Sequence, residues 1–270
     1  MDVHYQDGSV TLYNADSLQV MRSMPDDAVD VTVTSPPYNM GLVPGGNGRG
    51  MYAHTTQKSR RFTEGYSDGE ISDAMPHDEY LAWQRACLAE MWRISRLGVF
   101  YNHRPRVIHG QWTMPLDGDY GPDVVLGKVI IWDRGTGIDV NVRQFCTRGE
   151  WIMLFTKPDF RLIDHAASGM GDVWRLGIEY GVPDHPAPFP VSLPERCIQS
   201  TGATSVFDPF CGSGSTLVAA KQCGIRGIGV ELSKTYCTLA VERLAQSSLF
   251  EPADTTTDLH EQVSMFDTAV

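Results

Sequence analysis

The last third of the chain contains a strand-helix-strand unit that constrains the fold more than any other feature. The stretch "SVFDPF" at residues 205–210 predicts a strand, and "CGSGS" predicts a glycine turn after it. "TLVAAKQCG" predicts a helix that stops at a glycine, "IRGIGVEL" a second strand, and "SKTYCTLAVERLAQSS" a helix capped by Ser233. Strands joined in this way lie parallel in one sheet against which the helices pack. The unit therefore predicts an α/β fold with ligands at the carboxyl ends of its strands.

Earlier segments extend the same pattern. Three segments have the composition of strands, namely "SVTLY" (9–13), "AVDVTVT" (28–34) and "GVFYNH" (98–103). Helices are predicted after the first of them, over residues 77–95, and from Pro190 to residue 201. "KVIIWDRG" and "EWIMLFTKP" predict a hairpin-like pair of strands with a long connection. We therefore expect a mostly parallel, doubly wound sheet, with irregular segments at 40–76, 104–126 and 164–190.

Composition narrows the class of protein. The chain has 270 residues and is 42% hydrophobic, which is enough to fill the core of one large domain. It lacks an apolar run of about 18 residues, and its first residues lack the basic and apolar regions of a secretory signal, so we expect a cytoplasmic protein. Six cysteines without a C-x-x-C pair suit reduced thiols better than disulfides, and we expect no structural metal.

Positive charge gathers in two irregular segments although the net charge is −11. A uniformly basic nucleic-acid binder is thereby disfavoured, but local clusters can still place phosphates on one face of the protein. Solvated loop charges are the alternative explanation of either cluster. The candidate DNA-contacting residues are Arg49, Lys58, Arg60 and Arg61 in the first segment, and Arg104, Arg106 and Arg143 in the second.

The glycine turn and the acid after it predict a cofactor site. Gly212 and Gly214 allow the backbone to approach a ligand closely, and the helix that follows offers unpaired N–H groups. Leu217 leaves the G-x-G-x-x-G dinucleotide fingerprint incomplete. Glu231, at the end of the next strand, is placed to accept hydrogen bonds from ribose hydroxyls. Together these residues predict a nucleoside-containing cofactor; the alternative is a tight turn and a solvated glutamate.

The strand "AVDVTVT" ends in Ser35-Pro36-Pro37-Tyr38, which predicts a site for an aromatic amine. The prolines cannot continue a ladder, so the carbonyls of Ser35 and Pro36 are left as acceptors at the sheet edge. The Ser35 hydroxyl adds an acceptor, and Tyr38 offers a ring on which a base can stack. Accepting both N–H groups of an arylamine restores its nucleophilicity toward a methyl donor held in line. The alternative is that the prolines merely end the strand and Tyr38 lies in the core.

The sequence resembles the S-adenosylmethionine-dependent amino methyltransferases of DNA, in the permuted order where the catalytic motif precedes the cofactor motif. The resemblance rests on "LYNADSLQVMRSMPDDAVDVTVTSPPYN" and on "HPAPFPVSLPERCIQS" with "VFDPFCGSGSTLVAAKQCGIRGIGVELSKTYCTLAVERL". It implies a Rossmann-like, seven-stranded sheet, S-adenosyl-L-methionine as cofactor, and Ser35 to Tyr38 as the residues that hold the target base.

The resemblance also assigns the cofactor pocket. It places the methionine and adenosine parts against Phe207, Asp208, Pro209, Phe210, Gly212 and Gly214, and the ribose on Glu231. Asp16 would lie near the adenine or, alternatively, cap the next helix. His185, Phe189 and Pro190 match the segment that closes the cofactor site.

Position 35 bears on the choice of base. The family often has Asp there, and Ser is more usual among enzymes that methylate N4 of cytosine. We therefore favour N4-cytosine, with N6-adenine next, whereas C5 methylation would need a cysteine after proline, which is missing here. A nicotinamide oxidoreductase, a protein or amide methyltransferase and a silent DNA-binding module are competing hypotheses.

The expected organisation is a catalytic domain over residues 1–250 and a disordered tail over 251–270. The irregular inserts 41–76 and 104–148 are candidate target-recognition segments. The expected partner is double-stranded DNA with the target base flipped out. The recognition sequence, a companion restriction enzyme and the choice between monomer and homodimer stay open.

Overall fold

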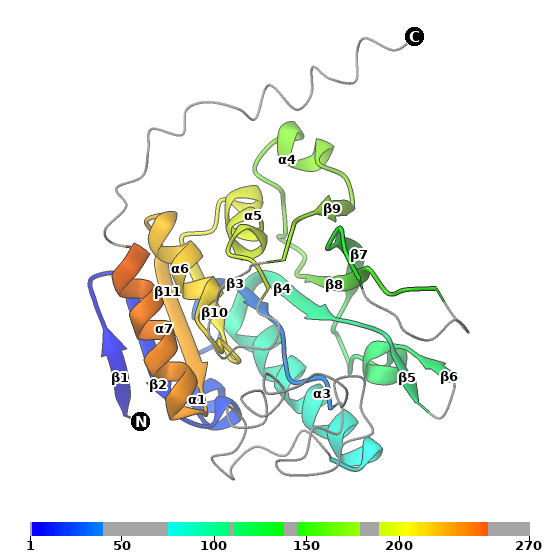
Figure 1. Cartoon of the computed structure of the whole chain (residues 1–270), viewed down its shortest axis with the longest axis horizontal. Coiled ribbons are helices and arrows are strands. Elements are labelled where there is room, and N and C mark those ends of the chain that lie inside the picture. The colour runs from blue at the N-terminus through cyan, green and yellow to red at the C-terminus, as the bar shows by residue number, and fades with distance from the viewer. Residues whose placement is uncertain (1, 40–74, 109–110, 138–144, 179–188, 248–270) are drawn as a thin grey trace.

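The computed structural model describes residues 2–39, 75–108, 111–137, 145–178 and 189–247 (Figure 1). A single nine-stranded sheet runs through these residues in the order β1-β2-β11-β10-β3-β4-β8-β7-β9. Its strands are β1 (Val3–Gln6), β2 (Val10–Asn14), β3 (Val29–Thr34), β4 (Ser95–His103), β7 (Leu126–Asp133), β8 (Gly149–Thr156), β9 (Val173–Arg175), β10 (Ser205–Asp208) and β11 (Arg226–Glu231).

The helices are α1 (Ser17–Ser23), α3 (His77–Ile94), α4 (His165–Gly169), α5 (Ser192–Thr201), α6 (Ser215–Gln222) and α7 (Lys234–Ser247). A 3₁₀ turn, η1 (Pro115–Gly118), and a small hairpin of β5 (Arg106–Ile108) and β6 (Gln111–Thr113) complete the elements. In the described part of the chain, no helix is long and apolar enough to cross a membrane.

The five strands from β2 to β4 in the sheet order are parallel, while β8 is antiparallel to both β4 and β7. This arrangement confirms the predicted α/β class with a mostly parallel, doubly wound sheet. The predicted strand count of seven is too low, because a short strand is added at each edge. A tight turn at Asp7 joins β1 to β2, which pair antiparallel. Asp7 Oδ1 stabilises the turn by accepting from the Ser9 and Val10 amides. At the other edge, the three residues of β9 pair with β7.

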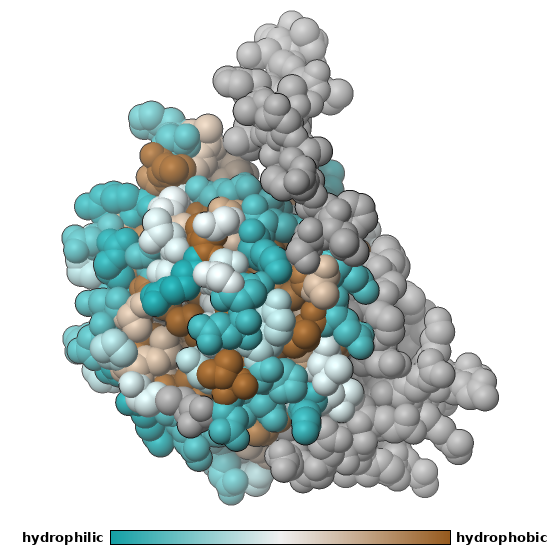
Figure 2. Space-filling model, turned by 90° about the vertical axis from the view of Figure 1, so that its left-hand side faces the viewer, coloured by the Kyte–Doolittle hydropathy of each residue, from teal (hydrophilic) through white to brown (hydrophobic). Residues whose placement is uncertain are grey.

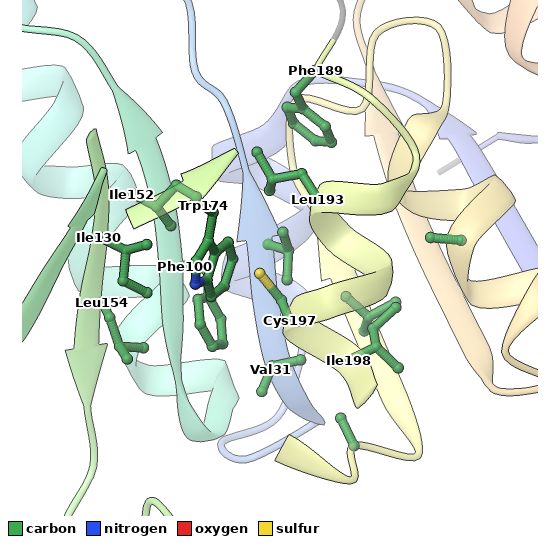
Figure 3. Packing of buried hydrophobic residues seen from close by; sticks show 14 of the residues in the cluster. Val31, Phe100, Ile130, Ile152, Leu154, Trp174, Phe189, Leu193, Cys197 and Ile198 are labelled. Carbon is green, nitrogen blue, oxygen red and sulfur yellow. The ribbon is translucent and has the colours of Figure 1, made fainter. Parts of the chain in front are cut away.

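Helices cover both faces of the sheet, which explains why all six residues of β3 are buried. Helices α1 and α3 pack on one face together with Val29. On the other face, Val31 of β3 packs in one hydrophobic cluster with Leu193 and Cys197 of α5. Trp174 of β9 belongs to the same cluster (Figure 3). The surface around β1 and α7 is mostly hydrophilic, with scattered apolar residues (Figure 2).

Close packing of α6 on β11 explains the missing third glycine of the turn motif. A Cβ atom on Gly229 would lie 2.8 Å from Leu217 Cδ1, and one on Gly227 would lie 2.8 Å from Ala220 Cβ. The small residues that permit close helix-strand contact are therefore on the strand. Leu217 is tolerated on the helix because Gly229 faces it.

Two segments expected to be irregular contain short elements. Residues 104–126 include the β5-β6 hairpin and η1, and residues 164–190 include α4 and β9. The candidate insert 104–148 also contains β7, which belongs to the main sheet. Most of the insert 41–76 and all of the tail 251–270 lie outside the described residues.

Candidate active site

The carboxyl ends of β3 and β10 meet where the strand order reverses, the place where doubly wound sheets bind ligands. Asp208, at the end of β10, is fully buried there. Its Oδ1 accepts from the Thr34 hydroxyl at 2.6 Å, and its Oδ2 accepts from the Thr216 hydroxyl at 2.6 Å. Burial raises the pKa of Asp208 to about 6, against the lowering effect of these bonds and of the Phe210 amide. Asp208 thus ties the strand that leads to Ser35 to the start of α6.

The glycine turn adopts the left-handed backbone that its residues permit. Gly212 has φ +50° and Gly214 has φ +84°, a region that favours glycine. Gly214 is the N-cap of α6 and supplies no side chain to the helix start. The first N–H groups of α6 therefore face the strand ends, where they suit an anionic or polar ligand group.

Glu231 lies beside this turn and is 8% exposed. Its Oε2 accepts from the Gly212 amide at 2.9 Å and its Oε1 from the Ser233 amide at 2.8 Å. Each oxygen keeps a second acceptor position, so the carboxylate can bind the two hydroxyls of a ribose. Burial raises the pKa of Glu231 to about 7. These donors and acceptors fit the nucleoside part of S-adenosyl-L-methionine.

Asp16 follows β2 next to Glu231, because the Ala15 amide donates to the Glu231 carbonyl at 3.2 Å. Its side chain caps α1 by accepting from the Gln19 amide at 2.9 Å. Asp16 therefore caps the helix, as one of the two sequence interpretations expected. It also lies beside the predicted ribose site.

The other predicted cofactor residues differ in where their side chains lie. Phe207 is fully buried in the core between the sheet and the helices α1 and α3, so its side chain packs beneath the site. Phe210 is partly buried, with its ring 5.4 Å from that of Trp83. The Pro209 carbonyl accepts from the Ser17 hydroxyl. Phe189 and Pro190 are buried at the entrance to α5, and His185 lies outside the described residues.

Arg243 is a functional candidate that the sequence did not reveal. From α7, its Nη1 donates to the Ser213 carbonyl at 2.8 Å, to the Ser213 hydroxyl at 2.9 Å and to the Ser215 hydroxyl at 3.2 Å. These contacts fasten the glycine turn to the last helix. An arginine on a regular amphipathic helix carries no local sign of this role.

The four residues after β3 form a compact polar motif. Ser35 Oγ lies 2.9 Å from the Tyr38 hydroxyl, and the Pro37 carbonyl accepts from the Tyr80 hydroxyl of α3 at 2.7 Å. The Tyr38 ring has the His103 ring against it, with centroids 4.5 Å apart. Because Ser35 and Tyr38 are only partly buried, the motif is accessible at the strand end.

Two residues on β4 and β8, the next two strands of the sheet after β3, join this motif and were missed from the sequence. The Tyr38 hydroxyl also lies 3.1 Å from Asn102 Oδ1 of β4 and 3.1 Å from Glu150 Oε2 of β8. Glu150 is 7% exposed and pairs with Arg134, whose Nη1 is 3.2 Å from Oε1. Only the antiparallel register of β8 on β4, which aligns Trp151 with His103, brings this carboxylate to the catalytic edge.

Few of the predicted DNA-contacting residues fall in the described part of the chain. Arg104 follows β4 beside Tyr38 and is partly buried. Arg106 begins β5, where the structure describes its backbone alone. The remaining five, Arg49, Lys58, Arg60, Arg61 and Arg143, lie outside the described residues. On the β5-β6 hairpin, Trp112 is 58% exposed and packs edge-on against Trp151, with ring centroids 5.6 Å apart.

A family model described as DNA methylase, of the type that modifies N6 and N4 amino groups, matches residues 29–242. The chain belongs to this family. It is a DNA methyltransferase with S-adenosyl-L-methionine as cofactor, so the predicted family and cofactor are confirmed. The oxidoreductase, the protein or amide methyltransferase and the silent binding module lose their support.

Two bacterial relatives match over most of the chain. The type II methyltransferase M.ScaI of Streptomyces caespitosus is 25% identical over 284 residues, covering 89% of this chain and 83% of the relative. The type II methyltransferase M.BglII of Bacillus subtilis is 26% identical over 274 residues, covering 87% and 68%.

Solved structures share the fold. A protein of Thermus thermophilus described as a DNA modification methylase, in complex with S-adenosyl-L-methionine, matches with a TM-score of 0.59 and 25% identity, covering 87% of this chain and 93% of that one. The cytosine-N4-specific PvuII DNA methyltransferase matches with a TM-score of 0.65, covering 95% and 90%, and at 15% identity it supports the fold alone.

Proposed function

We propose that this DNA methyltransferase modifies the exocyclic amine of a base turned out of double-stranded DNA, and that the base is cytosine, methylated at N4. The observation that carries the proposal is the serine motif at the end of β3, placed beside the cofactor strand. The hydrogen bond between Thr34 and Asp208 joins the residue before Ser35 to the strand that leads into the glycine turn.

The residues divide the chemistry between the ends of β11 and β10 on one side and the end of β3 on the other. Glu231 and the N–H groups at the start of α6 are placed to hold the cofactor, which supplies an electrophilic methyl group when bound. Ser35 Oγ and the Pro36 carbonyl are the acceptors for the two N–H groups of the target amine. Hydrogen bonds that pull these N–H groups out of the ring plane take the nitrogen lone pair out of conjugation with the base. The lone pair would then be free to accept the methyl group in place of the sulfonium sulfur, after which the amine loses one proton. Catalysis then rests on positioning and needs no covalent link between enzyme and base.

The choice of cytosine rests on Ser35. In the resemblance described above, serine at the first catalytic position is more usual for N4-cytosine enzymes and aspartate for N6-adenine enzymes. N6-adenine is the second candidate, because both bases present two N–H donors to the same acceptors.

The depth of the motif supports the proposal that the target base is flipped out. Ser35 and Tyr38 are partly buried and Pro36 is buried, so a base stacked in a duplex would not reach them. An extruded base can place its amine between Ser35 and Pro36 and stack on Tyr38. Binding along the duplex is assigned to the Arg-bearing segments, of which Arg104 lies beside Tyr38.

Methylation of plasmid DNA by the purified protein tests the function. After incubation with S-adenosyl-L-methionine, the DNA is digested and its nucleosides are measured by mass spectrometry. We expect N4-methylcytosine. Detection of N6-methyladenine alone would overturn the choice of base, and the absence of both products would overturn the proposed function.

A further inference from the structure

Serine at position 35 poses a chemical problem for amine methylation. The target amine donates two N–H bonds, so the residue that receives it must act as an acceptor. A carboxylate at this position could only accept, whereas a serine hydroxyl can either accept or donate. The Ser35 proton therefore has to be directed away from the amine by another group.

The contacts around Tyr38 provide this direction. Its hydroxyl lies within hydrogen-bond distance of three oxygens, namely Ser35 Oγ at 2.9 Å, Asn102 Oδ1 at 3.1 Å and Glu150 Oε2 at 3.1 Å. A phenol has one proton to donate. Burial, and then the negative charge of Glu150, raises the pKa of Tyr38 well above its ordinary value, so the phenol keeps that proton.

Two of the three oxygens are fixed as acceptors. The Asn102 amide nitrogen donates to the Trp151 carbonyl at 3.1 Å, which leaves its Oδ1 toward Tyr38. The other oxygen of Glu150 is paired with the Arg134 guanidinium at 3.2 Å, and an ionised carboxylate can only accept. Tyr38 therefore gives its proton to Glu150 or Asn102. The contact with Ser35 is then made by the Ser35 proton.

We propose that Glu150 is a positioning residue that acts through the Tyr38 hydroxyl to make Ser35 a hydrogen-bond acceptor for the target amine. With its proton committed to Tyr38, Ser35 Oγ presents its lone pairs to the amine N–H. Glu150 on β8, the second strand from β3 in the sheet, thereby supplies the acceptor-only character that an aspartate would have at position 35. This inference rests on the proposed amine methylation.

The test compares single-turnover methylation rates of four proteins: wild type, Glu150→Gln, Ser35→Asp, and the double variant. Glutamine keeps the shape of Glu150 but offers a donor, so Tyr38 can turn its proton toward Ser35. We expect Glu150→Gln to slow methyl transfer on the order of 10²-fold, as removal of one oriented active-site hydrogen bond does. Its affinity for S-adenosyl-L-methionine should stay unchanged.

The decisive result is the effect of Glu150→Gln in the Ser35→Asp background. Aspartate accepts without help, so Glu150→Gln should leave that rate unchanged or increase it. An equal loss in both backgrounds would show that Glu150 only supports the structure and would overturn the inference. A wild-type rate in Glu150→Gln would overturn it as well.

Further variants keep the test decisive if Ser35→Asp is inactive. In a Tyr38→Phe background the connection is already broken, so Glu150→Gln should slow the reaction no further; a full additional loss would overturn the inference. Glu90→Gln is the matched control, since Glu90 pairs with Arg93 at 2.7 Å on α3 away from the motif. Failure of the wild type to methylate any DNA would instead count against the proposed function.

Discussion

Two buried carboxyl groups at neighbouring strand ends have different tasks. Asp208 uses its oxygens for Thr34, Thr216 and the Phe210 amide, and thereby joins strands and helix. Glu231 accepts from the backbone N–H groups of Gly212 and Ser233 and retains acceptor capacity for a ligand. Asp208 is therefore assigned to the framework of the site and Glu231 to the cofactor.

The raised pKa of Glu231, about 7, predicts that cofactor affinity depends on pH. Ribose hydroxyls need the ionised carboxylate as acceptor, and the fraction ionised falls about tenfold for each pH unit below the pKa. Calorimetric titration with S-adenosyl-L-methionine between pH 5.5 and 8.5 should show affinity rising up to about pH 7 and then levelling. Glu231→Gln should bind weakly at every pH, and a wild-type affinity that is flat across this range would contradict the assignment.

The same groups predict a pH dependence of folding. The folded pKa of Asp208, about 6, and that of Glu231, about 7, exceed the unfolded values near 4. The folded chain therefore holds these protons more tightly, and the stability they contribute is present below about pH 4 and is lost as the pH rises through 6 to 7. Without cofactor, the melting temperature of Glu231→Gln should fall less over this range than that of the wild type. Parallel profiles would contradict the prediction.

At the residue scale, the sequence revealed groups that act within one motif. Ser35, Tyr38, Gly212, Gly214 and Glu231 follow strand ends and carry local signals. Glu150 and Asn102 could not be found in this way, because they lie within ordinary strands, as the second residue of β8 and the last but one of β4. Their importance arises only from the pairing of β8 with β4.

At the scale of elements, the close contact between α6 and β11 predicts that a single methyl group added to β11 destabilises the protein. Gly229→Ala would place a Cβ atom 2.8 Å from Leu217 Cδ1 and 3.1 Å from Cys211 Sγ. Overpacking of this kind should lower the free energy of unfolding by about 1–3 kcal/mol. Denaturant unfolding measures it. The loss of stability should be smaller when Leu217→Ala is also present. Gly8→Ala serves as the control, because a Cβ atom added at Gly8 would meet no atom within 4 Å.

The contact between α7 and the glycine turn predicts a loss of cofactor affinity. Arg243→Met removes three hydrogen bonds to Ser213 and Ser215 and frees the turn. We expect affinity for S-adenosyl-L-methionine to fall about tenfold, or about 1.4 kcal/mol. Arg226→Met, at the amino end of β11, is the control and should bind normally. Equal affinities for the two variants would show that the turn holds its shape without Arg243.

Long elements were predictable from the sequence, and short ones were not. The parallel strands β3 and β11 and the helix α3 carry enough β-branched residues or helical periodicity to be recognised. Strand β10 has only four residues and is the exception, because the glycine turn after it marks where it ends. β1 and β9 have four and three residues, too few to establish a period of two. They exist because the sheet edges beside them offer unpaired backbone groups, which is a property of the assembled sheet.

At the scale of the molecule, the exposed Trp112 predicts how DNA meets the catalytic edge. It stands on the β5-β6 hairpin against Trp151, the residue that follows Glu150. Trp112→Ala should weaken DNA binding about tenfold, since one aromatic-base stack contributes about 1–3 kcal/mol. Cofactor affinity should not change. Fluorescence anisotropy with labelled duplex measures the effect.

The control for this prediction is Ile163→Ala. Ile163 is 62% exposed but lies beside Gly202, ahead of β10 at the amino end of the sheet. Equal DNA affinities for the two variants would place the DNA elsewhere on the surface.

The sheet order also determines when this enzyme can become active during its synthesis. β2 and β3 follow each other in the chain, yet β11 and β10 separate them in the sheet. Among the described strands, β10 and β11 are synthesised last. The edges of β2 and β3 that pair with them therefore stay unpaired until about residue 231 has emerged from the ribosome. A chain cut short before that point would lack Glu231 and expose two open strand edges. Premature termination should therefore yield an inert fragment that aggregates, and never a partly active methyltransferase.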